Sequence, residues 1–208
     1  MARLTRVEQR AQTRADLLAA ARDRFLEVGY AAAGLEDIAD RAGYSKGAVY
    51  SNFVDKPNLC REVLQAIHAE KIGELADVVT GHGDLHERVE LLADWVQRTA
   101  GDVGWTMLEL EFITVARNDP DLLAMIVELR TEARRTVVEM LVDLVRGESG
   151  GDEQTVEQLR GTLESAAELL LSAGIGLGIQ RAIDPTIATE PVIESMRATL
   201  LMLATAGS

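Results

Sequence analysis

The chain has 208 residues, of which 47% are hydrophobic and 26% charged, a composition typical of a globular protein that buries a core. Its formal net charge of −13 argues against binding nucleic acid through bulk positive charge, and its single cysteine, Cys60, excludes an internal disulfide and a cysteine-rich metal site. The N-terminus lacks the apolar run of a secretory signal, and the longest nearly continuous apolar run, residues 169–179, is well below the roughly 20 residues that span a bilayer. We therefore expect a cytoplasmic protein that does not enter a membrane.

Hydrophobic periodicity predicts an all-α chain. Aromatic residues make up only 4% of the chain, and the abundant Ala, Leu, Glu, Arg and Val favour helix over sheet. Apolar residues recur at helical spacing, and Gly or Pro residues separate the periodic segments. We expect about nine helices, at about residues 10–28, 35–42, 45–53, 57–79, 85–100, 105–116, 120–144, 155–182 and 189–205, with a glycine-rich loop at 147–153.

Two short helices joined by a tight turn form the most informative pattern. The apolar residues of the segment 35–42 repeat over about two turns and stop at Gly43, which suits a left-handed C-cap. Ser45 follows, where its hydroxyl can accept backbone N–H bonds at the start of the next helix. The small Ala39 lies where the two helices must cross closely. This arrangement predicts a helix-turn-helix whose second helix enters the major groove of double-stranded DNA.

Charge is distributed unevenly along the chain. Residues 1–56 contain nine Lys and Arg against eight Asp and Glu, whereas residues 57–208 contain 12 against 26. The acidic surface therefore lies away from the predicted helix-turn-helix, and its field orients that end toward DNA. We divide the chain into a DNA-binding domain, residues 1–56, and an effector-binding and dimerisation domain, residues 57–208.

The segment 17–59 combines these features in a fixed order: LLAAARDRFLEVGYAAAGLEDIADRAGYSKGAVYSNFVDKPNL. Its informative positions are Ala21, Phe25, Gly29, Tyr30, Ile38, Ala39, Ala42, Gly43, Ser45, Gly47, Tyr50, Phe53 and Lys56. With all of these in register, the segment resembles the N-terminal domain of the TetR family of transcriptional regulators.

The resemblance implies which residues touch DNA. Lys46 and Gly47, at the start of the recognition helix, face bases, while Tyr50, Asn52 and Lys56 hold phosphates. The chemistry agrees, because glycine permits close backbone approach and the other side chains donate hydrogen bonds. Simple packing of Tyr50 on the first helix and a solvated Lys56 remain structural alternatives. The expected DNA-binding set is completed by Ser45, Gly34, Arg10 and Arg14, although the two arginines have an equally good alternative without phosphate contact.

Two positions depart from the family's pattern. Members commonly carry two threonines before the second helix, where a hydroxyl caps the helix and touches phosphate, but this chain has Ala33 and Gly34. Only backbone N–H contacts remain there. Asn52 stands where a histidine is frequent, which keeps a donor but changes its reach.

The resemblance also implies that the last two helices pair with a second copy in a four-helix bundle. A homodimer is expected on geometric grounds as well, because one recognition helix reads only half of a palindrome. In the penultimate helix Gly174 and Gly178 share one face, and each costs about 1 kcal/mol relative to alanine unless close packing offsets it. Met196, Leu200 and Leu203 form an apolar stripe on the last helix, with packing on its own protomer as the alternative.

The middle helices of the family enclose a small-molecule cavity, so the resemblance implies an effector site. Bulky or adaptable apolar residues and a few polar ones are candidates to line it, and each can instead belong to the core. The candidates are Trp95, Trp105, Met107, Leu110, Glu111, Phe112, Arg117, Met125 and Gln180.

No catalytic residue, metal site or cofactor is expected. The sequence GYSKG, residues 43–47, matches a nucleophile-elbow pattern, but that motif follows a strand and the preceding segment has a helical period. We predict a repressor that binds a palindromic operator as a dimer and is released by a small apolar or amphipathic effector. The alternatives are a ligand-independent regulator or activator, and a ligand-binding helical protein that has lost its affinity for DNA.

Overall fold

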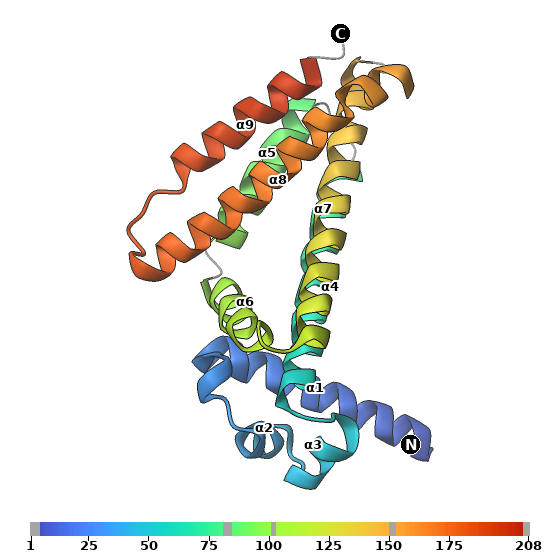
Figure 1. Ribbon diagram of the computed structural model, residues 1–208, viewed down its shortest axis with the longest axis vertical. Helices are drawn as coiled ribbons and strands as arrows, with labels where there is room; N and C mark the ends of the chain where they lie inside the picture. The colour runs from blue at the N-terminus through green and yellow to red at the C-terminus, as the bar shows by residue number, and fades with distance from the viewer. Residues whose placement is uncertain (1–4, 81–84, 101–102, 150–152, 206–208) are drawn as a thin grey trace. The chain divides into compact units, whose positions relative to one another are not determined.

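The computed structural model describes residues 5–80, 85–100, 103–149 and 153–205. Within these ranges the chain folds into nine α-helices and no strand (Figure 1), which confirms the all-α prediction. The helices are α1 (Arg6–Ala32), α2 (Leu35–Ala42), α3 (Lys46–Asn52), α4 (Lys56–Thr80), α5 (Leu85–Ala100), α6 (Val103–Ala116), α7 (Pro120–Ser149), α8 (Glu153–Ile183) and α9 (Glu190–Thr205).

The largest departures from the predicted bounds are at α1 and α7. The segment before residue 10 is helical because Thr5 and Glu8 form a capping box, in which Thr5 N–H donates to Glu8 Oε2 at 2.6 Å. The same bonds from Thr5 lower the pKa of the Glu8 carboxyl. Helix α7 runs on to Ser149, so part of the predicted glycine-rich loop is helical, and residues 150–152 lie outside the described chain.

The chain divides into two compact units. The first contains Met1–Ile67 and Met107–Ile126, and the second contains His68–Thr106 and Val127–Ser208. The first unit therefore extends beyond the expected boundary at residue 56. The beginning of α4 belongs to it, where Leu59 and Cys60 are completely buried.

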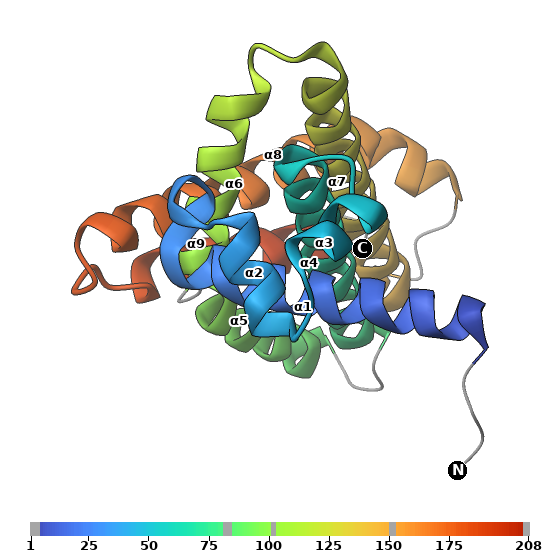
Figure 2. The ribbon, with the colours of Figure 1, turned by 90° about the horizontal axis from the view of Figure 1, so that it is seen from below.

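Helices α2 and α3 pack on α1 in the first unit (Figure 2). Phe25 of α1, Ile38 and Ala39 of α2, and Val49 of α3 are almost completely removed from solvent, as is Phe53 directly after α3. Ile38 and Ala39 belong to the apolar residues of the segment 35–42 whose helical spacing predicted a short helix with one apolar face. Burial of this face stabilises helices that are too short to form alone, because short isolated helices are marginal in water.

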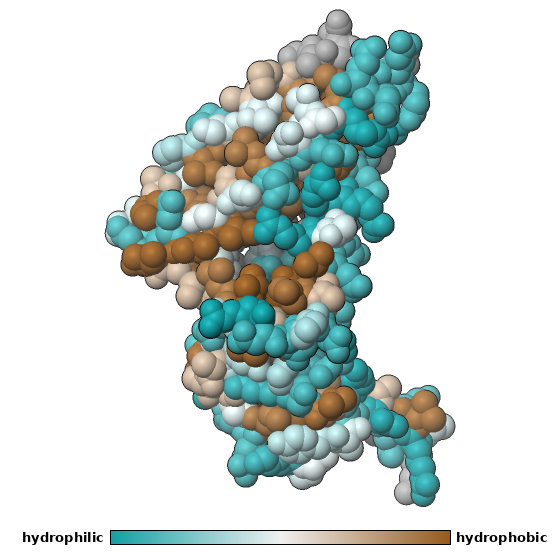
Figure 3. Space-filling view, viewed as in Figure 1, coloured by the Kyte–Doolittle hydropathy of each residue, from teal (hydrophilic) through white to brown (hydrophobic). Residues whose placement is uncertain are grey.

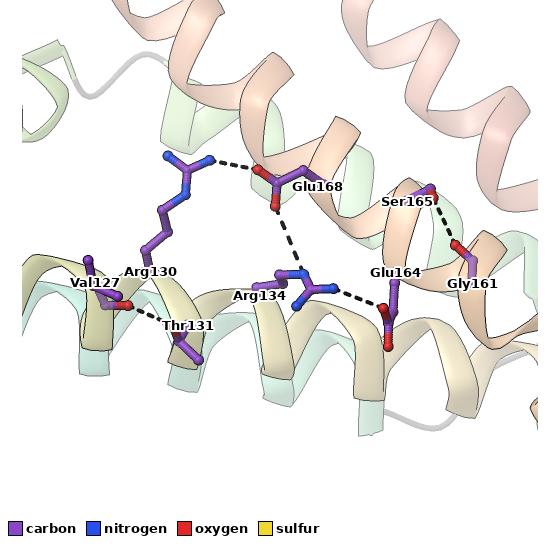
Figure 4. A network of polar contacts seen from close by, with 8 residues as sticks. All are labelled: Val127, Arg130, Thr131, Arg134, Gly161, Glu164, Ser165 and Glu168. Atoms are coloured by element: carbon purple, nitrogen blue, oxygen red, sulfur yellow. Dashed lines mark hydrogen bonds and ion pairs between the residues drawn. The ribbon is translucent and has the colours of Figure 1, made fainter.

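In the second unit, α5, α8 and α9 lie side by side (Figure 1). Their shared core includes Leu92 of α5, Leu163 of α8 and Leu200 of α9. Charged residues link further helices at the surface. Arg130 and Arg134 of α7, for example, pair with Glu168 and Glu164 of α8 at N–O distances of 2.7 and 3.0 Å (Figure 4).

Helix α8 is long and apolar enough to cross a membrane, judged by length and composition alone. The count of continuous apolar residues missed this, because glycine and serine interrupt the run without adding charge. A single such helix is weak evidence for a membrane span, since core helices of soluble proteins have the same properties. Only 33% of its most apolar window is buried, so much of its apolar surface is left uncovered by its own chain.

Candidate nucleic-acid interface

The turn between α2 and α3 has the predicted backbone geometry. Gly43 adopts φ 78° and ψ 24°, the left-handed conformation that glycine reaches without strain, and the N–H of Tyr44 donates to the Ala39 carbonyl at 2.9 Å. Ser45 is extended and precedes α3, but its side chain makes no capping hydrogen bond. The predicted capping role of its hydroxyl is therefore wrong, and the hydroxyl remains available to another partner.

Helix α3 presents three of the predicted DNA-contacting residues to solvent. Lys46 and Gly47 are exposed at its first turn, and Tyr50 is 55% exposed. The Lys46 ammonium lies 3.6 Å from a carboxylate oxygen of Glu36, the exposed acid in the first turn of α2. Val49 is buried beneath them, so the helix has one face in the core and one face open to a ligand.

Asn52 is turned back on its own helix. Its side-chain Nδ2 donates to the Ala48 carbonyl at 2.8 Å, and the residue is half-buried. A phosphate contact by this amide requires the side chain to give up that bond.

Arg10 and Arg14 of α1 both donate to the C-terminal end of α3. Arg10 Nη2 reaches the Ser51 carbonyl at 3.4 Å, and Arg14 Nη1 reaches the Asn52 carbonyl at 3.3 Å. Cations at the last carbonyls of a helix offset its dipole, and α3 has no basic residue of its own in its last turn. The two arginines therefore stabilise the C-terminal end of α3 by hydrogen bonds from α1.

Arg14 makes two further contacts. Its Nη2 lies 2.6 Å from a carboxylate oxygen of Glu62 on α4, and its guanidinium stacks 4.4 Å from the centre of the Phe53 ring. The sequence predicted a DNA-backbone contact for Arg14 and not these contacts within the protein. The sequence feature that could have indicated them is the lack of a basic residue in the last turn of α3.

Lys56 also points inward, toward the end of α1. Its Nζ donates to the Ala31 carbonyl at 3.3 Å and lies 4.5 Å from the centre of the Tyr30 ring. Burial lowers the pKa of Lys56 and raises that of Tyr30 to about 12. The N–H of Ala31 donates to Glu111 Oε2 at 3.0 Å, so the carboxylate of this effector-site candidate contacts the end of α1.

The start of α2 has no cap from its own side chain. Gly34 occupies the N-cap position without a side-chain hydrogen bond, and Ala33 is buried. Exposed backbone at Gly34 is thus the remaining donor surface there, beside the acidic Glu36 and Asp37. Asp37 is paired with Arg24 of α1, which offsets part of that negative charge.

The predicted effector residues are distributed over both compact units. In the second unit, Trp95 lines a cleft of about 430 Å³ together with charged residues of α4 and α5, and its Nε1 donates to Glu74 at 3.1 Å. Trp105 lies edge-on to the buried His68, with ring centres 5.6 Å apart. Gln180 is exposed.

The other effector candidates lie in the first unit, where some are buried in the core and others are exposed or half-exposed. Phe112 is completely buried, and its ring meets Tyr30 edge-on at 5.8 Å, so it belongs to the core around the end of α1. Met125 is also buried. Met107, Leu110 and Arg117 are exposed or half-exposed.

The residues expected at the dimer seam are largely used within the protomer. Leu200 and Leu203 are buried in the core of the second unit, and Met196 packs against that core. Gly178 is buried, and a Cβ added there would lie 2.5 Å from Thr106 Oγ1 on α6. Gly174 has open space around its Cα. The packing alternative therefore holds for the stripe on α9, because its spacing matches a core face as well as an interface.

Comparisons with known proteins agree with this geometry. Residues 17–63 match the family described as bacterial regulatory proteins, tetR family. The chain is 29% identical over 197 residues to the HTH-type transcriptional activator FasR of Mycolicibacterium smegmatis, covering 92% of this chain and 83% of the relative. It is 31% identical over 107 residues to the HTH-type transcriptional repressor AcnR of Corynebacterium diphtheriae, covering 51% of this chain and 52% of the relative.

Solved structures share the fold over nearly the whole chain. A TetR-family transcriptional regulator from Mesorhizobium loti aligns with a TM-score of 0.71 and 18% identity, covering 97% of this chain and 98% of the other. The fatty acid degradation regulator FadR from Bacillus halodurans aligns with a TM-score of 0.66 and 17% identity, covering 91% and 94%. Residues 17–63 are thus a TetR-family helix-turn-helix domain, and the chain shares the fold of solved TetR-like transcriptional regulators.

Proposed function

We propose that the protein binds a palindromic operator as a homodimer and represses transcription until a small amphipathic effector releases it. One observation carries the DNA-binding part of this proposal. The exposed residues Lys46, Gly47 and Tyr50 lie on one face of α3, while Val49 is buried on the other. A short helix held in this way offers donors to a groove without rearranging its own packing.

The residues divide into base-reading and phosphate-binding roles. Lys46, at the first turn of α3, has a cation suited to guanine O6 and N7, and Glu36 nearby limits its directions of approach. Tyr50 has a neutral donor suited to phosphate, as do the backbone N–H groups at Gly34. Arg10 and Arg14 act behind α3, so their contribution is to its placement.

A second copy of the chain is the proposed occupant of the uncovered surface of α8 and α9. Hydrophobic side chains gather over these helices in the space-filling view (Figure 3). Leu169 and Ile175 of α8 and Met202 of α9 are exposed, and most of the apolar window of α8 is not buried by its own chain. Burial of such a face in a symmetric dimer removes it from water and supplies the two recognition helices that a palindrome requires.

The effector proposal is supported by the cleft beside Trp95. Lys71, Glu74 and Arg98 line it with the indole, so a ligand there meets both an aromatic face and charges of either sign. This lining favours an amphipathic effector over a wholly apolar one. The chain contains only two tryptophans, so their fluorescence gives a direct reading of binding.

A mobility-shift assay with genomic fragments tests the function. A specific shift at moderate salt, with a palindromic footprint, is expected, and the absence of any specific fragment contradicts the proposal. Dodecanoate added to the complex serves as an amphipathic probe and is expected to quench or shift the fluorescence of Trp95 while releasing DNA. Trp95→Phe is the matched control, because it removes the reporting indole but keeps an aromatic side chain.

An activator is the second candidate, favoured by the similarity over 92% of this chain to FasR, which is named an activator. The two signs of regulation give opposite results in a promoter reporter. Deletion of a repressor raises expression from its promoter, whereas deletion of an activator lowers it.

A further inference from the structure

The carboxylate of Glu111 on α6 occupies the space left by a glycine in α1. Gly29 has φ 81° and ψ 169°, which interrupts the helix one turn before its end. A Cβ placed there would lie 3.0 Å from Glu111 Cδ and closer still to Oε1. From this position Glu111 Oε2 accepts the Ala31 N–H at 3.0 Å. A glycine is therefore needed at position 29 both for the backbone angle and for the carboxylate.

Ala31 is held through both of its backbone polar groups. Its N–H donates to Glu111, and its carbonyl accepts from Lys56 Nζ at 3.3 Å. The charge of Glu111 also favours the ammonium form of Lys56, opposing the effect of burial on its pKa. Because the ammonium has three donors, the bond to Ala31 fixes its position while leaving capacity for a further acceptor.

The turn that contains Ala31 leads directly into the N-terminus of α2, which is proposed to face DNA. Gly34 begins that helix without a side-chain cap, and Ala33 before it is buried. The placement of the N–H groups at the start of α2 consequently depends on the turn that contains Ala31. In this chain that turn is anchored from α6.

We propose that Glu111 is a positioning residue for DNA binding, which acts through Ala31 to place the start of α2 and the ammonium of Lys56 on the operator backbone. This inference rests on the operator-binding function proposed above. Glu111 does not touch DNA itself, and its effect passes through backbone groups and one lysine.

The test compares Glu111→Ala, Glu111→Gln and Glu111→Asp with wild type by operator titration in a mobility shift, at a temperature at which thermal denaturation shows every variant to be folded. Glu111→Ala is expected to weaken binding about five- to tenfold, which corresponds to the loss of about one hydrogen bond. Glu111→Gln recovers most of this loss, because its amide oxygen still accepts from Ala31. Glu111→Asp keeps the charge but is one methylene too short, and is expected to bind as weakly as alanine.

Glu128→Ala is the matched control, because it removes one carboxylate from an exposed position of α7. Loss of an acidic charge alone favours binding to a polyanion, so the control is expected to bind equally or slightly more tightly. Binding of Glu111→Ala within twofold of wild type, or equal weakness of the Gln and Ala variants, contradicts the role of Glu111. A wild-type protein that shifts no specific fragment contradicts the proposed function itself, and the inference with it.

Discussion

The hydroxyl of Tyr44 donates a 2.8 Å hydrogen bond to Oδ2 of Asp16, joining the turn of the helix-turn-helix to α1. Asp16 also accepts from Gln12 Nε2 at 2.8 Å through its other oxygen. Tyr50, by contrast, is 55% exposed on α3. Tyr44 thus stabilises the DNA-binding part formed by α1–α3 and the start of α4 (the head), whereas Tyr50 is exposed to a ligand.

Tyr44→Phe is expected to lower the free energy of unfolding by about 1 kcal/mol, because it removes one partly buried hydrogen bond while Asp16 keeps Gln12. Urea denaturation measures the change. Tyr50→Phe is the control and should unfold at the wild-type urea concentration. Equal stability of all three proteins would show that the bond to Asp16 adds nothing to the head.

Arg14→Ala is expected to destabilise the protein by about 1–3 kcal/mol, because the Asn52 carbonyl, the Glu62 carboxylate and the Phe53 ring all lose their cationic partner. Operator affinity should fall as well, since the end of α3 is released. Arg6→Ala removes an equal charge from the exposed start of α1 and serves as the control in both assays. A variant that loses affinity at unchanged stability would instead support a direct phosphate contact by Arg14.

Gly29→Ala is expected to destabilise the protein by about 2–3 kcal/mol, because the backbone angles there are almost restricted to glycine and the new Cβ meets Glu111. Gly73→Ala is the control, since Gly73 is exposed within α4 and has open space around it. That substitution should raise stability by about 0.5–1 kcal/mol through helix propensity. Thermal unfolding of both variants checks the opposite signs, and a tolerated Gly29→Ala would remove the argument for a strained turn.

Tyr50→Ala is expected to weaken binding on every DNA sequence, whereas Lys46→Ala should change which operator is preferred, by about 1–3 kcal/mol at the affected base. A binding selection on randomised half-sites distinguishes the two effects. Uniform losses from both variants would contradict the division into base-reading and phosphate-binding roles.

Leu169→Arg is expected to leave the protein monomeric where the wild type forms the proposed homodimer, because it places a charge on the exposed apolar surface of α8. Val127→Arg is the control, since Val127 is 57% exposed on α7 and lies outside the proposed interface. Light scattering after size-exclusion chromatography reports the mass of each. A Leu169→Arg protein that stays dimeric would place the interface elsewhere.

Periodicity was sufficient to predict the helices and the inward positions of the head from the sequence. Ile38 and Ala39 face the core as the apolar spacing of the segment 35–42 indicates, and Gly43 ends α2 in the left-handed conformation. Local patterns of this kind are readable because hydrophobic spacing and backbone preference act within a few residues. Helix α1 begins before the expected residue 10 because Thr5 and Glu8 form a capping box.

Spacing could not distinguish a core face from an interface, since both require the same apolar period. The apolar stripe with Leu200 and Leu203 is therefore compatible in sequence with either a partner surface or a core face, and both residues are buried within the protomer. Similarly, Glu111 and Phe112 are neighbours in a helix expected to line a cavity, and both are used at the end of α1. Their partners are far away in sequence, and no local pattern contains them.

The all-α class, the helix-turn-helix and the family of that domain can be read from the sequence alone, because these depend on local propensity and on a fixed register over residues 17–63. How the charged residues of the head are used depends on the folded chain. Arg14 and Lys56 are directed inward, to carbonyls at the ends of α3 and α1. The physical reason is that a cation is placed by the nearest unpaired carbonyl, carboxylate or aromatic face, and only the folded chain brings those groups within reach.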